Sequence, residues 1–414
     1  MRFSPRKKKL TVLLLVLALL LLTLTGCGGE TSSPTAAPTK TPTEAPTAAP
    51  TGDPAATPEP AIPDNVPVIG NLRWVETVPL EYANQFAIYR YEGGYSYIDL
   101  KESDKILVVP EGKPLPEGLP KDLVVVQRPL DRIYMAATSA MALFDGLDAL
   151  DTIIFVGSRN WYTENAIAAM ESGKFAYAGK YNAPDYEQLL DGGCRLAIES
   201  TMILHNPEVK EKLIEVGIPT IVERSSYEEH PLGRTEWIKV YGALLGLEDR
   251  ANAIFDGEVE KIRALEALES TGKTVAFFYI NSSGNVVTYK TDGYVPAMIR
   301  IAGGEYIFTD LGLDDDSKLS TINMNMENFY NTAVKADIII YNCSIASQLY
   351  TMEDLLSLSA VLEDFKAVKD GQVWCTTESM FQQTDKMGTI IQEMNRIFSG
   401  QTDGSDLEFI FQLH

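Results

Sequence analysis

The chain has 414 residues, 45% of them apolar, which is enough for two domains with hydrophobic cores. Its formal charge is −22, and its first nine residues carry five positive charges, so the remainder carries −27. A protein with this large a negative charge repels nucleic acid and anionic membrane surfaces. We therefore argue against both as direct partners.

The N-terminus predicts export and lipidation. A basic start precedes the apolar run Leu10–Thr25, which is shorter than the ~20 residues that a spanning helix needs, as in a secretory signal. The run ends in Leu24-Thr25-Gly26-Cys27, which resembles the lipobox of bacterial lipoproteins. This resemblance implies a signal peptide over residues 1–26, a diacylglyceryl thioether on Cys27, and a protein anchored to the cell membrane on its extracytoplasmic side. The alternative is a plain signal peptide or N-terminal anchor with an incidental cysteine.

Residues 27–65 predict a tether behind the lipid anchor. The stretch Glu30–Pro63 is nearly all Pro, Thr, Ala, Ser and Glu, and it has no aromatic residue. With so little to bury, we expect it to stay extended and disordered.

Residues 66–230 predict an N-terminal lobe. Phe86–Leu100 alternates apolar and polar residues around two glycines, which indicates a β-hairpin. Asp131–Met135 leads into Thr138-Ser139, a predicted N-cap for a helix over 140–150. Further strands are predicted over Ile106–Val109, Leu123–Val126, Thr152–Val156, Leu196–Ile198 and Ile218–Val222, with a helix over Pro207–Val216. This alternation predicts an α/β fold with a mostly parallel sheet.

Loops after the carboxyl ends of parallel strands are where small ligands bind. Here those loops carry arginine, aromatic and hydroxyl side chains. The candidate ligand-binding residues of this lobe are Ser139, Arg159, Trp161, Tyr162, Ser226 and Tyr227. Arginine beside aromatic rings suits a large ligand with anionic or carbonyl oxygens. The alternative for each is an ordinary surface residue.

Residues 231–270 predict a bridging helical segment between two similar halves. Its second part, Asp249–Ser270, places an apolar stripe on one face at three- and four-residue spacing. Gly246 breaks the segment in two. We interpret the segment as a strut, and the alternative is one surface helix of a larger domain.

Residues 271–414 predict a C-terminal lobe in which the alternation resumes. Strands are predicted over Thr274–Ile280, Asp337–Tyr341 and Gln372–Cys375, and helices over Gly293–Ala302 and Met352–Leu362. Tyr279, Tyr294 and Met380 lie near strand ends or loops and are candidate ligand-binding residues facing a cleft between the halves.

Each half has a glutamate at the start of a helix that leads into a strand: Glu187 in the first and Glu327 in the second. A first-turn carboxylate is favoured by the helix dipole by ~0.3–1 kcal/mol, so one interpretation is capping. The other interpretation is that the two glutamates form a symmetric pair of acidic docking residues for a basic partner with two-fold symmetry.

The chain resembles the substrate-binding lipoproteins of ATP-binding-cassette importers for iron–siderophore complexes, cobalamin and haem, a class III periplasmic-binding-protein-like family. The resemblance covers about Lys121 to Gly400. It rests on DRIYMAATSAMALFDGLDALDTIIFVG, on Pro184–Leu190, on KLIEVGIPTIV followed by the helical segment, on YVPAMIRIAGGEYIF and on MENFYNTAVKADIIIYN.

This resemblance implies two Rossmann-like lobes joined by a single long helix, and a binding protein rather than an enzyme. It also implies that Glu187 and Glu327 dock on arginines of a permease dimer. An iron–siderophore complex is our first choice of ligand, because arginine and aromatic residues crowd the cleft loops. Cobalamin stays an alternative, and so does haem, for which tyrosines and Met380 offer axial ligands.

The only histidines, His205, His230 and His414, are scattered, so we expect no metal site and no resident cofactor. Once Cys27 is lipidated, three cysteines remain: Cys194, Cys343 and Cys375. We expect buried free thiols, and a Cys343–Cys375 disulfide is the alternative.

Two rival functions remain. An extracytoplasmic glycoside-hydrolase-like enzyme would use Glu187 and Glu327 as an acid/base pair ~5–10 Å apart across a cleft. A surface adhesin outside transport would also make use of the tether. Facing carboxylates would favour the enzyme, whereas outward-pointing, separated carboxylates favour docking.

Overall fold

The computed structural model describes residue 63 and residues 65–314, 319–344, 346 and 348–414. The signal peptide, Cys27 and almost all of the predicted tether lie outside this part of the chain. Ala61–His414 forms one compact unit. Within the described ranges, no helix combines the length and apolar character needed to cross a bilayer.

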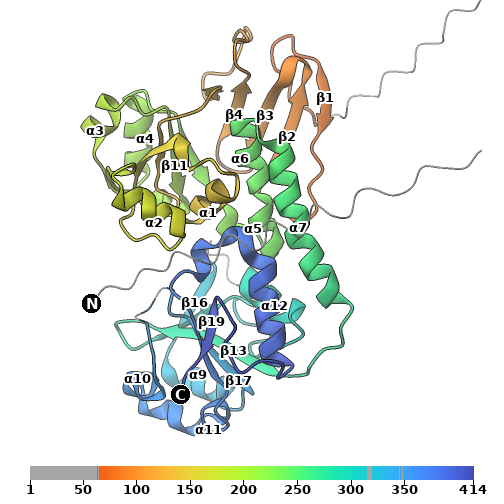
Figure 1. The fold of residues 1–414 in the computed structure, drawn as a ribbon, viewed down its shortest axis with the longest axis vertical. Coiled ribbons are helices and arrows are strands. Elements are labelled where there is room, and N and C mark those ends of the chain that lie inside the picture. Colours follow the sequence, from red (N-terminus) through yellow and green to blue (C-terminus); the bar gives the residue numbers. More distant parts are fainter. Residues whose placement is uncertain (1–62, 64, 315–318, 345, 347) are drawn as a thin grey trace, which may run out of the picture. The chain divides into compact units, whose positions relative to one another are not determined.

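The first sheet has five strands in the order in which they occur along the chain (Figure 1). They are β1 (Trp74–Thr77), β2 (Phe86–Tyr91), β3 (Tyr95–Leu100), β4 (Lys105–Val109) and β5 (Val124–Gln127). The predicted hairpin is confirmed, because β2 and β3 pair from Phe86↔Leu100 to Tyr91↔Tyr95. Gly93 and Gly94 make the turn with φ values of 80° and 85°, which glycine adopts without strain. β4 and β5 pair with each other in parallel and belong to this sheet, not to the parallel sheet of the lobe.

The second sheet is wholly parallel and has the order β12-β11-β6-β7-β8. Its strands are β6 (Ile133–Met135), β7 (Ile153–Val156), β8 (Ala176–Tyr177), β11 (Leu196–Ser200) and β12 (Thr220–Glu223). Alternate residues face opposite sides, so Ile133 and Met135 join one hydrophobic cluster while Tyr134 joins another.

Helices and a small ribbon complete this lobe. The helices are α1 (Thr138–Gly146), α2 (Glu164–Glu171), α3 (Tyr186–Asp191) and α4 (Pro207–Glu215), and the ribbon pairs β9 (Gly179–Lys180) with β10 (Ala183–Pro184). The predicted N-cap of α1 is wrong: Ala137 occupies that position, and no side chain caps the helix.

The bridging segment consists of three helices, α5 (Pro231–Glu236), α6 (Ile238–Leu245) and α7 (Glu248–Glu266). Gly246 ends α6 in the left-handed conformation, with φ 78°, as the predicted break requires. α7 ends at Glu266, four residues before the predicted Ser270, and is roughly 28 Å long at 1.5 Å per residue. Its predicted apolar stripe is buried, with Phe255 and Ile262 both at 0% exposure.

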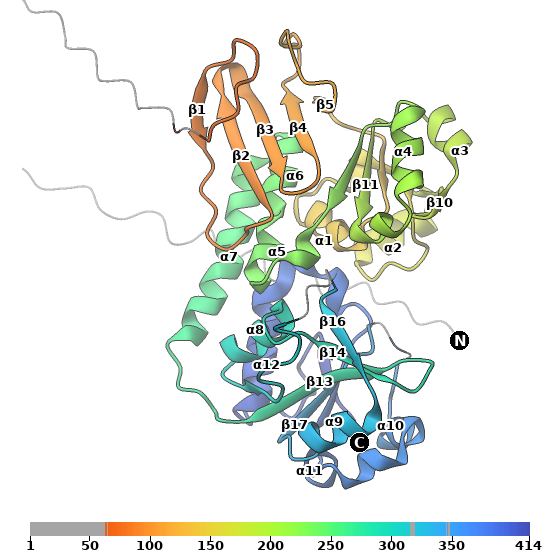
Figure 2. The ribbon, with the colours of Figure 1, turned by 180° about the vertical axis from the view of Figure 1, so that it is seen from behind.

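The third sheet is parallel at its centre and antiparallel at both edges (Figure 2). Its order is β16-β14-β13-β17-β18-β19, with β15 beside β13. The strands are β13 (Thr274–Ile280), β14 (Val286–Tyr289), β15 (Glu305–Tyr306), β16 (Thr321–Met324), β17 (Ile338–Tyr341), β18 (Val373–Thr376) and β19 (Ile410–Gln412).

The helices around this sheet are α8 (Tyr294–Ile301), α9 (Met326–Ala333), α10 (Met352–Leu358), α11 (Lys366–Lys369) and α12 (Met387–Phe398). α10 is shorter than predicted, and Ala360–Asp364 continues as a 3-10 turn. α12 was not predicted. It lies against α7, where the N–H of Gly388 donates a 2.9 Å hydrogen bond to Glu258. A Cβ at Gly388 would come within 2.8 Å of that glutamate, so glycine permits this close approach.

Candidate ligand pocket and docking residues

A pocket of about 480 Å³ opens at the carboxyl ends of β6, β7, β8 and β11. Side chains that line it include Thr138, Ser158, Arg159, Asn160, Tyr177 and Lys180. The guanidinium carbon of Arg159 lies 3.9 Å from the centroid of the Tyr177 ring. The pocket therefore offers two cations and an aromatic face at the edge where the parallel sheet predicts a ligand.

Two other predicted residues of this lobe, Ser139 and Tyr162, lie near residues of the C-terminal lobe. The hydroxyl of Ser139, which lies inside α1 as its second residue, donates a 2.6 Å hydrogen bond to Glu223. Tyr162 is half-buried, and its pKa is raised by burial and by the carboxylate of Glu378 from the C-terminal lobe. Ser226 and Tyr227 are half-buried in the turn after β12.

Three of the predicted ligand-binding residues are buried in the hydrophobic core. Trp161 is 4% exposed, Tyr294 is 6% exposed and Met380 is fully enclosed. Tyr279 is half-buried at the end of β13, and burial raises its pKa. In this structure Met380 therefore acts as a packing residue and presents no surface to a ligand.

The segment Met380–Lys386 joins the two lobes at the predicted residues. The hydroxyl of Thr384 donates to the backbone oxygen of Ser139, and its own backbone oxygen accepts a 2.8 Å bond from Thr235. The side-chain amide of Gln382 donates a 3.4 Å bond to the backbone oxygen of Asn160. The structure therefore brings residues 139, 160 and 380–386, which are far apart in sequence, to one place.

Sequence reasoning missed Arg234, Tyr177 and Lys180. Tyr177 and Lys180 belong to strands of two residues each, which are too short for a periodic pattern. Arg234 lies in the bridging segment, whose residues were all given a structural role. The sequence carries no signal for it, because the burial of Pro231–Glu236 is visible only in the structure.

Glu187 and Glu327 occupy matching positions in α3 and α9. Asp185 caps α3 by accepting a 3.0 Å bond from the N–H of Gln188, and Asn325 caps α9 by accepting a 2.8 Å bond from Asn328. Each glutamate is the second residue of its helix and is exposed. Neither makes a hydrogen bond or an ion pair with another residue of the described ranges. The two helices are therefore capped by Asp185 and Asn325, and the carboxylates of both glutamates have no partner among the described residues.

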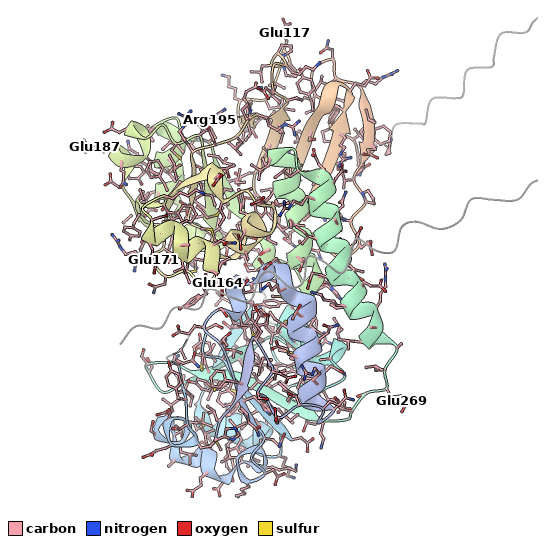
Figure 3. The ribbon with its side chains drawn as sticks, viewed as in Figure 1. Glu117, Glu164, Glu171, Glu187, Arg195 and Glu269 are labelled. Atoms are coloured by element: carbon pink, nitrogen blue, oxygen red, sulfur yellow. The ribbon has the colours of Figure 1, made fainter. Side chains whose placement is uncertain are left out.

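The two glutamates do not form a common site. Glu187 borders a shallow depression with residues of its own lobe, Phe155, Asp185, Gln188 and Asp191. Figure 3 shows its side chain at the outer edge of α3, pointing away from the ribbon. None of the five most pronounced pockets of the described residues contains both carboxylates, as an acid/base pair in a cleft would require.

Thiols and metal-ligating groups add no further site. Cys194, Cys343 and Cys375 are free. In the part of the chain that the structure describes, no three or more His, Cys, Asp and Glu side chains gather as metal ligands would.

The amino-acid sequence is similar to a known protein family and to two lipoproteins. Residues 123–379 match the family described as periplasmic binding protein. An uncharacterised lipoprotein of Methanocaldococcus jannaschii is 25% identical over 296 residues, which cover 67% of this chain and 68% of the relative. A second uncharacterised lipoprotein of that organism is 28% identical over 173 residues, covering 40% and 42% of the two chains.

Solved structures show the same fold at low sequence identity. A periplasmic haem-binding protein from Pseudomonas aeruginosa has a TM-score of 0.54 at 14% identity, over 69% of this chain and 98% of that one. The haem-binding protein HutB of Vibrio cholerae has a TM-score of 0.53 at 17% identity, over 66% and 98%. The petrobactin-binding protein of Bacillus subtilis has 0.51 at 13% identity, over 65% and 93%. The family match covers well over half of the chain, and the chain therefore belongs to the periplasmic-binding-protein family, whose members bind substrates and are not enzymes.

Proposed function

We propose that this protein is a lipid-anchored extracytoplasmic binding protein that captures an iron–siderophore complex and delivers it to an ATP-binding-cassette permease dimer. The observation that carries the ligand proposal is the pocket containing Arg159, Tyr177 and Lys180. A ferric siderophore presents chelating oxygens with negative charge beside an organic framework. Guanidinium and ammonium groups pair with such oxygens, while the tyrosine ring covers apolar surface.

Delivery is supported by the two exposed glutamates. Each stands free on the first turn of a helix in a different lobe, which suits pairing with arginines of a two-fold partner. Anchoring is supported by the lipobox-like sequence ending in Cys27 and by the lipoprotein relatives. The tether would then hold the folded part near the permease.

The test is a titration of purified protein starting near Asn65. Ferric siderophores, cyanocobalamin and haemin are added separately, and intrinsic tryptophan fluorescence and visible absorbance are followed. We expect saturable binding of a ferric siderophore, weakened at least tenfold by Arg159→Ala. Binding of haemin or cyanocobalamin alone would assign the protein to the haem or cobalamin alternative. No response to any of them would refute the proposed ligand class.

A further inference from the structure

Arg234 of α5 is a buried cation to which the described chain supplies no hydrogen-bond acceptor. The residue is 3% exposed, and its Nε and Nη1 atoms are enclosed with no acceptor among the described residues. A guanidinium group does not deprotonate in proteins, so the charge persists. A buried, unpaired charge is unfavourable for folding, and such a group requires a reason to be retained.

The surroundings of Arg234 are aromatic. Its guanidinium carbon lies 4.4 Å from the centroid of the Tyr294 ring. That ring packs edge-to-face against Tyr289 and Phe381, with centroids 6.0 and 6.2 Å away. The cation–π contact offsets part of the cost of burial, yet it leaves the planar fork of N–H donors unfilled.

The position of Arg234 is central to the two lobes. α5 begins the bridging segment, whereas Tyr294 begins α8 of the C-terminal lobe, and both ribbon views place α5 between the elements of the two lobes (Figures 1 and 2). The next residue, Thr235, bonds Thr384, which in turn bonds Ser139 of the N-terminal lobe. These bonds link the two lobes at the residue that follows Arg234 in the chain.

Two other charged side chains of this molecule, Arg195 and Glu236, are supplied with hydrogen-bond partners. Arg195 donates to the backbone oxygens of Pro129 and Gln127 and to the carboxylate of Asp131, at 2.6 to 2.9 Å. Glu236, two residues after Arg234, accepts three backbone N–H groups. Two other buried groups also have nitrogen or oxygen atoms without a hydrogen-bond partner, Arg224 and Glu199. Arg224 nevertheless lies 3.8 Å from the carboxylate of Glu102, and the carboxyl of Glu199 can stay protonated and neutral, whereas Arg234 has neither option. Since no described residue supplies an acceptor to Arg234, a bound ligand is the partner that we consider for it.

We infer that Arg234 is a ligand-binding residue that receives a carboxylate group of the ligand, with the Tyr294 ring beside it. This inference rests on the proposed function and narrows it. The ligand is an anionic, carboxylate-bearing chelate, and neutral chelates such as a hydroxamate complex or a cobalamin are disfavoured. A carboxylate matches the guanidinium fork through two parallel N–H···O bonds and neutralises the charge that the apo protein keeps buried.

The test uses Arg234→Met and Arg234→Lys, with Arg195→Met as the matched control for an arginine that has its partners. Binding of ferric citrate, haemin, ferrichrome and cyanocobalamin is measured by calorimetry, and the Tm of each apo protein is recorded. The Tm is measured again with citrate alone. We expect the preferred probe to bear carboxylates and its Kd to rise at least tenfold in Arg234→Met, with an intermediate rise in Arg234→Lys. Citrate should raise the Tm of the wild type and not that of Arg234→Met.

The stability readout separates a ligand role from a structural role. Because Arg234→Met removes an unpaired buried charge at similar volume, its apo Tm should equal or exceed that of the wild type. Arg195→Met should lower the Tm and leave the Kd unchanged. An unchanged Kd in Arg234→Met, or tighter binding of ferrichrome or cyanocobalamin than of either carboxylate chelate, overturns the inference while the transport proposal stands. If none of the four probes binds the wild type, the proposed ligand class is wrong. If citrate then also fails to raise the Tm of the wild type, the role inferred for Arg234 is wrong as well.

Discussion

The carboxylate of Glu236 accepts a 2.7 Å hydrogen bond from the backbone N–H of Ala83, 153 residues earlier in the chain. The same carboxylate accepts 2.9 Å bonds from the N–H groups of Tyr82 and Glu81, and Lys239 lies 2.7 Å away. The loop before β2 is thus tied to the bridging helices through one fully buried side chain. This connection holds the first sheet, which lies mostly outside the family match, on the body of the protein.

Glu236→Ala should lower the free energy of unfolding by roughly 3–5 kcal/mol, because it removes the acceptor of three partly buried N–H donors and the carboxylate that pairs with Lys239. Urea denaturation followed by circular dichroism measures this change. The control is Glu260→Ala on α7, where the side chain is 75% exposed and the expected change is within about 0.5 kcal/mol. Equal effects of the two variants would contradict the role given to Glu236.

Glu187→Ala combined with Glu327→Ala should abolish ligand uptake by cells and leave the Kd of the purified protein unchanged. Both side chains are exposed, and removal of two first-turn charges costs at most about 1–2 kcal/mol of stability. Uptake of the radiolabelled ligand and calorimetry give the two measurements. The paired control is Glu171→Ala with Glu363→Ala, two exposed glutamates elsewhere. Weakened binding in the first double variant would instead place these acids in the ligand site.

Glu199 should make stability depend on pH. Burial raises the pKa of its carboxyl from 4.5 to about 8, and neither oxygen has a hydrogen-bond partner among the described residues. Between pH 4.5 and 8 the folded state keeps a proton that the unfolded state releases, so the free energy of unfolding falls as pH rises through this window.

Glu199→Gln removes this titration. The variant should exceed the wild type in stability by a few kcal/mol at pH 8.5 and differ little at pH 4.5, because each pKa unit corresponds to about 1.4 kcal/mol. Urea titrations at a series of pH values measure both. A constant difference across the series would show that Glu199 does not titrate in this range.

Gly246→Ala should destabilise the joint between α6 and α7. Gly246 has a φ of 78°, a backbone conformation that is strained for a residue with a side chain. The Cβ of an alanine at this position would also lie 2.5 Å from Nη1 of Arg128. We expect a loss of about 1–2 kcal/mol in thermal or urea unfolding. Gly257→Ala is the control, because this glycine lies inside α7 with no atom near its Cβ, and alanine there should stabilise by ~0.5–1 kcal/mol.

Local patterns in the sequence determined several elements correctly. The alternation of Phe86–Leu100 around two glycines fixed the hairpin, and the strand Thr274–Ile280 has the predicted bounds. The three- and four-residue spacing predicted the buried face of α7, because a helix repeats every 3.6 residues wherever it lies. The matching places of Glu187 and Glu327 were also readable, since each begins a helix before a strand.

Only the tertiary structure decided which strands share a sheet and which polar groups find partners. β4 and β5 read like strands of the lobe but join the first sheet, since pairing depends on residues far away in sequence. Ser139 was expected to cap a helix and instead bonds Glu223. The burial of Arg234 without an acceptor follows from α5 packing against α8, a contact between segments about sixty residues apart. The periodicity of a sequence indicates whether a segment forms a helix or a strand. The burial of its polar groups and their hydrogen-bond partners depend instead on which distant segments pack against it.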